Sequence, residues 1–116
     1  MNNYKIIAVR IKAILFLNGE PPEKADIPDL EGYSQSLCAD GAYAYLHEYG
    51  IIPDLILGDM DSLPVPLRSK EVGRRIVELP DQDYTDFEKI LMYLHEKTDI
   101  RKIDVYGASG REQDHF

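Results

Sequence analysis

Two aspartates separated by one residue are the feature of the sequence most suggestive of chemistry. Asp59 and Asp61 belong to a Gly-Asp-Met-Asp-Ser segment that directly follows the apolar run 55–57. In an extended backbone, side chains two residues apart point to the same side, where two carboxylates can share one hard cation. Gly58 permits an unusual backbone angle or a close ligand approach, and Ser62 adds a hydroxyl. The same residue types are typical of an ordinary polar turn, and the segment alone does not decide between the two.

A second polar group surrounds the start of a predicted helix. Residues 85–88, Thr-Asp-Phe-Glu, match a capping box. Asp86 in the first turn is typical of a residue that stabilises the helix dipole by roughly 0.3 to 1 kcal/mol. Lys89, one turn further, can form a weak ion pair with Asp86 or reach a phosphate group. Gln82 and Thr85 are turn and cap residues first, and ligand contacts second.

A glycine-containing segment near residue 116 offers further candidates. The backbone N–H groups of residues 107–110, Gly-Ala-Ser-Gly, can hold a phosphate, and Arg111 adds a forked donor. Asp114 and His115 follow, as a second acid with a general base or as a plain loop end. Glycine turns are common, so this segment carries little weight by itself.

The elements that must position these residues alternate between strand-like and helix-like segments. Strands are predicted for the later part of 4–17 and for 36–39, 55–57, 75–79 and 102–106. Apolar residues at helical spacing predict helices over 42–49 and from the capping box to about residue 97. Asp40 stands where a cap of the first helix belongs. Residues 20–32 are expected to be an irregular connection, 63–72 a loop with a short helix, and 107–110 a turn. The alternation predicts an α/β fold with a parallel sheet flanked by helices.

This topology brings acidic residues to one edge of the sheet. In an open parallel sheet, ligands bind beyond the carboxyl ends of the strands. The acids expected after four successive strands are Asp40, Asp59 with Asp61, Asp81 with Asp83, and Asp114. We therefore expect the functional site at this edge.

Composition limits the possible partners. The chain has 116 residues, 44% of them hydrophobic, which suits one domain over 1–116 with a core of its own. Its net charge of -8 disfavours nucleic acid, whereas a cationic substrate, or an anionic one carried with a divalent cation, suits it. The apolar run 11–17 is shorter than the roughly 20 residues of a membrane span, so no membrane partner is expected. The single cysteine, Cys38, is expected to be a buried apolar residue and fits a cytoplasmic protein.

Four segments, read together and in order, resemble the motifs of thiamine pyrophosphokinases. They are Cys-Ala-Asp40-Gly41-Ala42, Pro53-Asp54-Leu-Ile-Leu-Gly58-Asp59-Met-Asp61-Ser62, Asp81-Gln82-Asp83-Tyr-Thr85-Asp86-Phe-Glu-Lys89, and Gly107-Ala-Ser-Gly110 to Asp114-His115. The combination is far more specific than any one segment. The resemblance extends from Asn18-Gly19 onward.

The resemblance implies a three-layer α/β/α domain with a mostly parallel, Rossmann-like sheet that binds Mg²⁺ and ATP. It also implies a carboxy-terminal β-sandwich domain and a homodimer in which thiamine lies between domains of different subunits. Residues 1–116 are accordingly expected to be the catalytic domain, without that β domain. The implied reaction transfers pyrophosphate from ATP to the hydroxyl of thiamine, giving thiamine diphosphate and AMP.

The resemblance also assigns roles to individual residues. The implied magnesium ligands are Asp59, Asp61 and Asp86, and the catalytic set adds Asp114. The residues implied to lie near nucleotide, pyrophosphate or thiamine are Asp40, Gly41, Ser62, Gln82, Thr85, Lys89, Arg111 and His115. One departure concerns the last motif, which in the family reads Gly-Gly-Arg-x-Asp-His. Here Arg111 occupies the place of the second glycine, and Glu112 that of the arginine.

Three alternatives stay open at this point. The motifs recognise metal and phosphates rather than the acceptor, so a pyrophosphokinase for another hydroxymethyl heterocycle, such as a pterin, would share them. The altered segment at Arg111 and Glu112 also suits a metal- or nucleotide-binding module without catalysis. A metal-dependent phosphoesterase would release inorganic phosphate without an acceptor.

Overall fold

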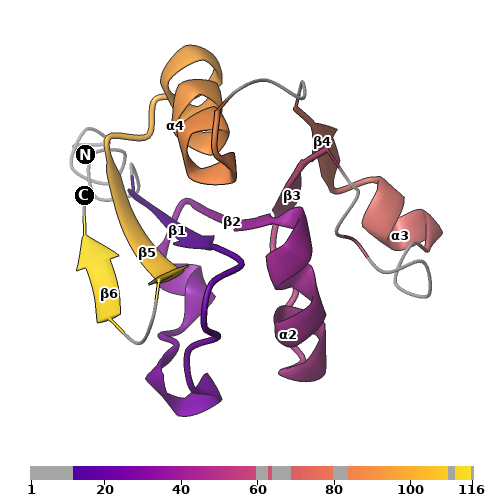
Figure 1. Ribbon diagram of the computed structural model, residues 1–116, viewed down its shortest axis with the longest axis vertical. Helices are drawn as coiled ribbons and strands as arrows, with labels where there is room; N and C mark the ends of the chain where they lie inside the picture. Colours follow the sequence, from indigo (N-terminus) through magenta and orange to yellow (C-terminus); the bar gives the residue numbers. More distant parts are fainter. Residues whose placement is uncertain (1–11, 60–62, 64–68, 80–83, 110–111, 116) are drawn as a thin grey trace, which may run out of the picture.

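Figure 1 shows the computed structural model of the chain, which describes residues 12–59, 63, 69–79, 84–109 and 112–115. Its centre is a six-stranded sheet in the order β4-β3-β2-β1-β5-β6. The strands are β1 (Lys12–Phe16), β2 (Gln35–Ala39), β3 (Leu55–Gly58), β4 (Ile76–Glu78), β5 (Lys102–Ser109) and β6 (Glu112–His115). Five strands are parallel, and β6 pairs antiparallel with β5. The predicted α/β fold with a mostly parallel sheet is confirmed.

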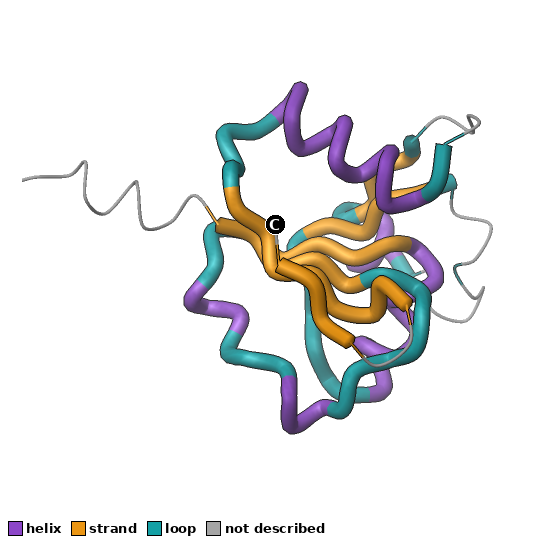
Figure 2. Tube along the Cα trace, turned by 60° about the vertical axis from the view of Figure 1, so that its left-hand side comes forward, coloured by secondary structure: helices purple, strands orange, loops and turns teal. Residues whose placement is uncertain are grey.

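Helices cover both faces of the sheet, which gives the expected three layers (Figure 2). The α-helices are α2 (Tyr43–Glu48), α3 (Lys70–Gly73) and α4 (Asp86–Lys97), and the 3-10 turns are η1 (Lys24–Asp26), η2 (Leu30–Gly32) and η3 (Asp40–Ala42). The long helix α4 packs on one face through Ile90 and Leu94, and it is the only described helix there. On the other face lie α2, α3 and the two turns η1 and η2. Among the helices of the described residues, none is long and apolar enough to cross a membrane.

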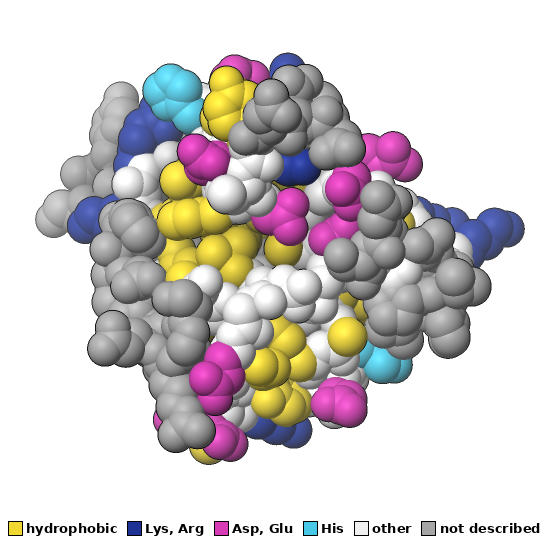
Figure 3. Space-filling view, viewed as in Figure 1, with side chains coloured by type: hydrophobic (Ala, Val, Ile, Leu, Met, Phe, Trp, Pro, Cys, Tyr) yellow, Lys and Arg dark blue, Asp and Glu magenta, His cyan; other side chains and the backbone are white. Residues whose placement is uncertain are grey.

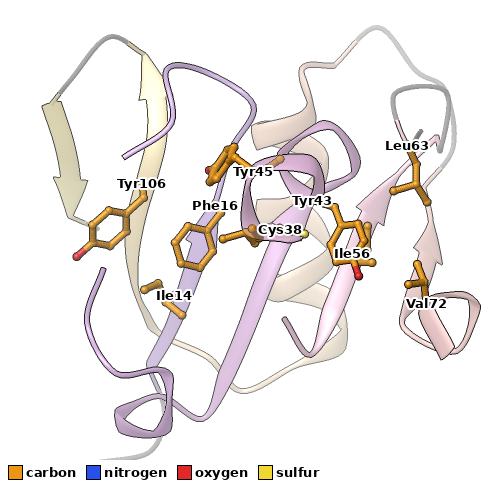
Figure 4. Close-up of a cluster of buried hydrophobic side chains, with 11 residues drawn as sticks. Ile14, Phe16, Cys38, Tyr43, Tyr45, Ile56, Leu63, Val72 and Tyr106 are labelled. Atoms are coloured by element: carbon orange, nitrogen blue, oxygen red, sulfur yellow. The ribbon is translucent and has the colours of Figure 1, made fainter. Parts of the chain in front are cut away.

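The apolar runs of the strands follow from burial on both faces, as is usual for parallel sheets. Successive side chains of a strand point to opposite faces. Ile14 and Phe16 therefore join the core under α2, whereas Ala13 and Leu15 join the core under α4. In the first core, the ring of Phe16 lies 5.7 Å from that of Tyr106 on the neighbouring strand β5 (Figure 4).

The prediction of a turn at 107–110 is wrong for the residues of this segment that belong to strand β5. Strand β5 continues through Gly107 to Ser109, and Ser109 pairs with Glu112 of β6. Pairing with β6 satisfies an extended backbone that the sequence pattern alone marks as a turn. Gly107 has a φ of +75° and stands where the ladder shifts its register between Val105 and Ser109, so the glycine serves an irregularity inside the strand.

Candidate functional site

The carboxyl ends of β1, β2 and β3 lie side by side at one edge of the sheet. Ala39 pairs with Leu57, so the residues that follow, Asp40 and Gly58, are also neighbours. Asp59 comes next and is half-buried. The expectation that Asp40 and Asp59 follow neighbouring strand ends is confirmed.

Glycines allow these strand ends to approach closely. A β-carbon at Gly41 would lie 2.3 Å from Nδ2 of Asn18, and one at Gly58 would lie 2.7 Å from Cγ of Asp40. Both distances are too short for any real β-carbon, so side chains from neighbouring strands occupy the space above each glycine. Asn18 was not selected from the sequence as a site residue. The rule that sites form beyond strand ends, applied to β1, would have found it.

Asp40 is buried, with 2% of its surface exposed. Its Oδ1 accepts a hydrogen bond from the backbone N–H of Gly41 at 2.8 Å. The expectation that Asp40 caps the following α-helix is wrong. A 3-10 turn intervenes, and α2 begins after Ala42 without a side-chain cap.

The amino end of α4 carries the predicted capping box. Thr85 accepts from the N–H of Glu88 at 3.1 Å, and Glu88 accepts from the N–H of Thr85 at 2.9 Å. This reciprocal pair satisfies two backbone donors that the first helical turn leaves open. Thr85 is therefore a cap residue, as its position in the sequence suggested.

Asp86 and Lys89 form the expected ion pair, with Nζ of Lys89 3.7 Å from Oδ1 of Asp86. The lysine side chain is only 7% exposed, whereas that of Asp86 is 46% exposed. Lys89 lines a cavity of about 590 Å³ between α4 and β4, together with Leu79, Tyr84 and Tyr93. This cavity was not predicted from the sequence. On the face shown in Figure 3, acidic side chains gather over β3 and β4, beside α4.

Cys38 and Tyr45, which lie in the core beneath this edge, are not nucleophiles. Burial raises the pKa of the Cys38 thiol far above its ordinary value, with a smaller contribution from the negative charge of Asp40. A buried thiol of raised pKa is inert. Burial likewise raises the pKa of the Tyr45 hydroxyl, which donates a hydrogen bond to the carbonyl of Leu17 at 2.9 Å. Cys38 is the buried apolar residue that was expected.

The chemistry of the predicted metal ligands fits Mg²⁺, which prefers carboxylate oxygens. Asp59 and Asp86 provide such oxygens from the end of β3 and the start of α4. Asp61, the third predicted ligand, lies outside the described residues. Within the part of the chain that the structure describes, no three acidic, histidine or cysteine side chains come together as a metal site. The three-aspartate site stays a prediction.

The remaining predicted residues are distributed as follows. Ser62, Gln82 and Arg111 lie outside the described residues, as do Asp81 and Asp83. Asp114 and His115 belong to β6, where their backbones pair with Val105 and Asp104. A strand position is incompatible with a plain loop end, and their role as an acid with a base stays a prediction.

Comparison with known proteins points to one family. Residues 30–116 match the sequence family described as the catalytic domain of thiamin pyrophosphokinase. The thiamin pyrophosphokinase structure from Geobacillus thermodenitrificans is 27% identical with a TM-score of 0.66, and the match covers 87% of this chain and 48% of that one. The yeast enzyme is 30% identical with a TM-score of 0.54, and the match covers 72% of this chain and 31% of that one. The Bacillus subtilis enzyme is 28% identical with a TM-score of 0.52, and the match covers 85% of this chain and 49% of that one. The chain thus spans less than half the length of each of these structures.

Proposed function

This chain belongs to the thiamin pyrophosphokinase family, and on that premise we propose that the full-length protein transfers the pyrophosphoryl group of ATP to the hydroxyl of thiamine. The products are thiamine diphosphate and AMP. The observation that carries this proposal is the family match over residues 30–116, a range that includes the acids beyond the ends of β2 and β3.

The proposed reaction exchanges one phosphorus–oxygen bond for another. The hydroxyl oxygen of thiamine bonds to the β-phosphorus of ATP, and the bond between that phosphorus and the oxygen bridging to the α-phosphorus breaks. AMP leaves with the bridging oxygen. The hydroxyl proton passes to a base, for which Asp86, Asp114 and His115 are equal candidates.

The protein contributes position and charge rather than a covalent intermediate. For phosphoryl transfer, positioning and electrostatic stabilisation supply most of the rate. Asp59, Asp61 and Asp86 would hold Mg²⁺, which would supply positive charge to offset the polyphosphate. Lys89 of α4 adds a second cation, and its burial strengthens its attraction for a phosphate oxygen. Gly41, over which the amide of Asn18 packs, lets the strand ends approach closely at the same edge of the sheet.

Charge also favours the proposed acceptor. Thiamine is a cation, and the chain carries a formal net charge of -8. An acidic surface raises the local concentration of a cationic substrate and speeds its association. We infer that the full-length protein acts as a homodimer, with thiamine held between the subunits, as the family resemblance implies.

The proposal is tested by measuring AMP formation from ATP and Mg²⁺ by the full-length protein, with and without thiamine. Asp59→Ala should abolish the thiamine-dependent signal. Asp99→Ala is the matched control, because Asp99 is an exposed aspartate that precedes β5, at the opposite edge of the sheet. AMP that forms only with thiamine, in the wild type and in the control, is the expected result.

Other outcomes separate the alternatives. If the folded wild type forms AMP only with a different hydroxymethyl heterocycle, that compound is the acceptor in place of thiamine. Inorganic phosphate without any acceptor would indicate a phosphoesterase. A folded protein that consumes no ATP would indicate a metal- or nucleotide-binding module without catalysis.

A further inference from the structure

We propose that Asp40 is a positioning residue, which sets the position of Asp59 through contact with Gly58. This inference rests on the proposed function, because it assumes that Asp59 binds the magnesium ion. It departs from the expectation that Asp40 contacts nucleotide or thiamine directly.

The Asp40 carboxylate packs directly on Gly58. Its Cγ, Oδ2 and Oδ1 lie 2.7, 2.9 and 3.0 Å from the place of a β-carbon at residue 58. The three distances are nearly equal, so the carboxylate lies flat over the glycine. It occupies the space that a side chain at residue 58 would fill.

The Asp40 carboxylate faces the neighbouring backbone and is closed off from solvent. Asp40 is 2% exposed, and its Oδ1 accepts from the N–H of Gly41. The space above Gly41 is in turn occupied by the amide of Asn18. The contacts therefore form a row across the ends of β1, β2 and β3, and Asp40 is enclosed within that row rather than presented to a ligand.

The backbone of Gly58 has an unusual conformation and is held from both sides. Its φ of +154° is one that residues with a side chain rarely adopt. On the side of β4, its carbonyl accepts from the N–H of Leu79 at 2.8 Å. Asp40 on the β2 side and Leu79 on the β4 side thus hold the residue that leads directly into Asp59. Displacement of this backbone would move the Asp59 carboxylate.

A displaced ligand weakens metal binding without removing a contact to the nucleotide. Misplacement of a functional group by about 1 Å can cost up to about 100-fold. We therefore expect Asp40→Ala to raise the dissociation constant for Mn²⁺, a spectroscopic substitute for Mg²⁺, by at least about tenfold. Binding of ATP in the presence of EDTA should stay within about twofold of the wild type, because Asp40 does not face the nucleotide.

The conservative variant separates positioning from direct contact. Asp40→Asn keeps the shape of the side chain and an oxygen that can accept from the N–H of Gly41, so its Mn²⁺ affinity should stay near the wild-type value. A carboxylate that contacted the metal or a cationic substrate would lose its effect equally in the Asn and Ala variants. Gly58→Ala should weaken Mn²⁺ binding like Asp40→Ala, and the double variant should be no weaker than the worse single variant, because both act on one contact.

The experiment is a titration of full-length protein with Mn²⁺, followed by electron paramagnetic resonance, with circular dichroism to verify folding. Recovery in Asp40→Asn together with unchanged metal-free ATP binding is the expected result. Normal Mn²⁺ binding by folded Asp40→Ala would overturn the inference alone, and so would equal losses in the Asn and Ala variants. A wild type that binds no Mn²⁺ and forms no AMP would overturn the proposed function and this inference with it.

Discussion

The ammonium of Lys89 lies 3.7 Å from the carboxylate of Asp86, and the lysine is buried while the aspartate is about half exposed. The pair lies within one turn of α4, where exposed ion pairs contribute only about 0.2 to 0.5 kcal/mol to helix stability. A pair of this kind adds little to helix stability, so substitutions can test the ligand roles proposed for both residues. The first two predictions follow from this asymmetry.

Asp86→Asn should separate activity from stability. We expect thiamine-dependent AMP formation by the full-length protein to fall at least about tenfold, because the variant loses the charge of a proposed metal ligand. The free energy of unfolding should change by less than about 1 kcal/mol, since the substituted Asp86 side chain is 46% exposed to solvent. Initial rates and urea unfolding measure the two effects. A stability loss well above that limit with a normal rate would make the pair structural.

Lys89→Met should raise the KM for ATP about tenfold or more, because the cation proposed to meet a phosphate is removed. Methionine suits a buried position beside Tyr84 and Tyr93, so the thermal midpoint should be kept or raised. Lys97→Met is the matched control, since Lys97 lines the same cavity from the exposed end of α4. Equal effects of the two variants on KM would argue against a specific role for Lys89.

The capping box should make stability depend on pH. The backbone N–H and the side chain of Thr85 hold the pKa of Glu88 below its ordinary value of 4.5. The unfolded chain then binds this proton more readily than the folded chain does, so stability rises with pH in this range. The contribution of Glu88 is fully present above its ordinary pKa and is lost as the pH falls through the lower pKa of the folded state.

Glu88→Gln tests this dependence by thermal unfolding across the acid range. The wild type should unfold at a higher temperature than the variant at neutral pH, and the difference should shrink in acid. Thr85→Ala removes the other half of the box and should cost about 1 kcal/mol at neutral pH. A difference between wild type and Glu88→Gln that grew on acidification would contradict the assignment.

Helix α4 should also anchor its face of the sheet. Ile90 is fully buried, whereas Met92, two residues away, is 44% exposed. Ile90→Ala should lower the free energy of unfolding by about 2 to 5 kcal/mol through the cavity that it leaves. Met92→Ala should change it by no more than about 0.5 kcal/mol. Denaturant unfolding of the two variants compares them directly, and similar losses would mean that α4 packs differently.

Much of the fold was predictable because local and global signals agree. The capping box at Thr85 and the apolar spacing of Ile90 and Leu94 predict α4, and the structure confirms it. The strand predicted for 75–79 appears as β4, and the connection at 20–32 is irregular apart from short 3-10 turns. In each case the residue pattern and the tertiary packing require the same conformation.

The exceptions depend on contacts between distant residues. Pairing with β6 keeps Gly107 within β5, although its neighbours are typical of a turn. Asp40 is a common cap residue type, yet its side chain lies over Gly58, and no periodicity in the sequence encodes that contact. The strand-end rule correctly placed Asp40 and Asp59 after neighbouring strands, and their functional roles stay predictions. The roles of Asp61, Ser62, Gln82 and Arg111 stay predictions, because these residues lie outside the described part of the chain.

The position of β1 has a consequence for how the protein is made. Its two neighbours come from distant parts of the chain, since Ala13 pairs with Gln35 on one side and Lys12 pairs with Lys102 on the other. During synthesis, the ribosome releases β2, β3, β4 and α4 before β5 can close the open edge of β1. Pairing between distant segments forms slowly, because the intervening loop must first be closed. Until β5 is made, the apolar strand β1 therefore has one unpaired edge in the nascent chain, which is the interval in which a chaperone would be of most use.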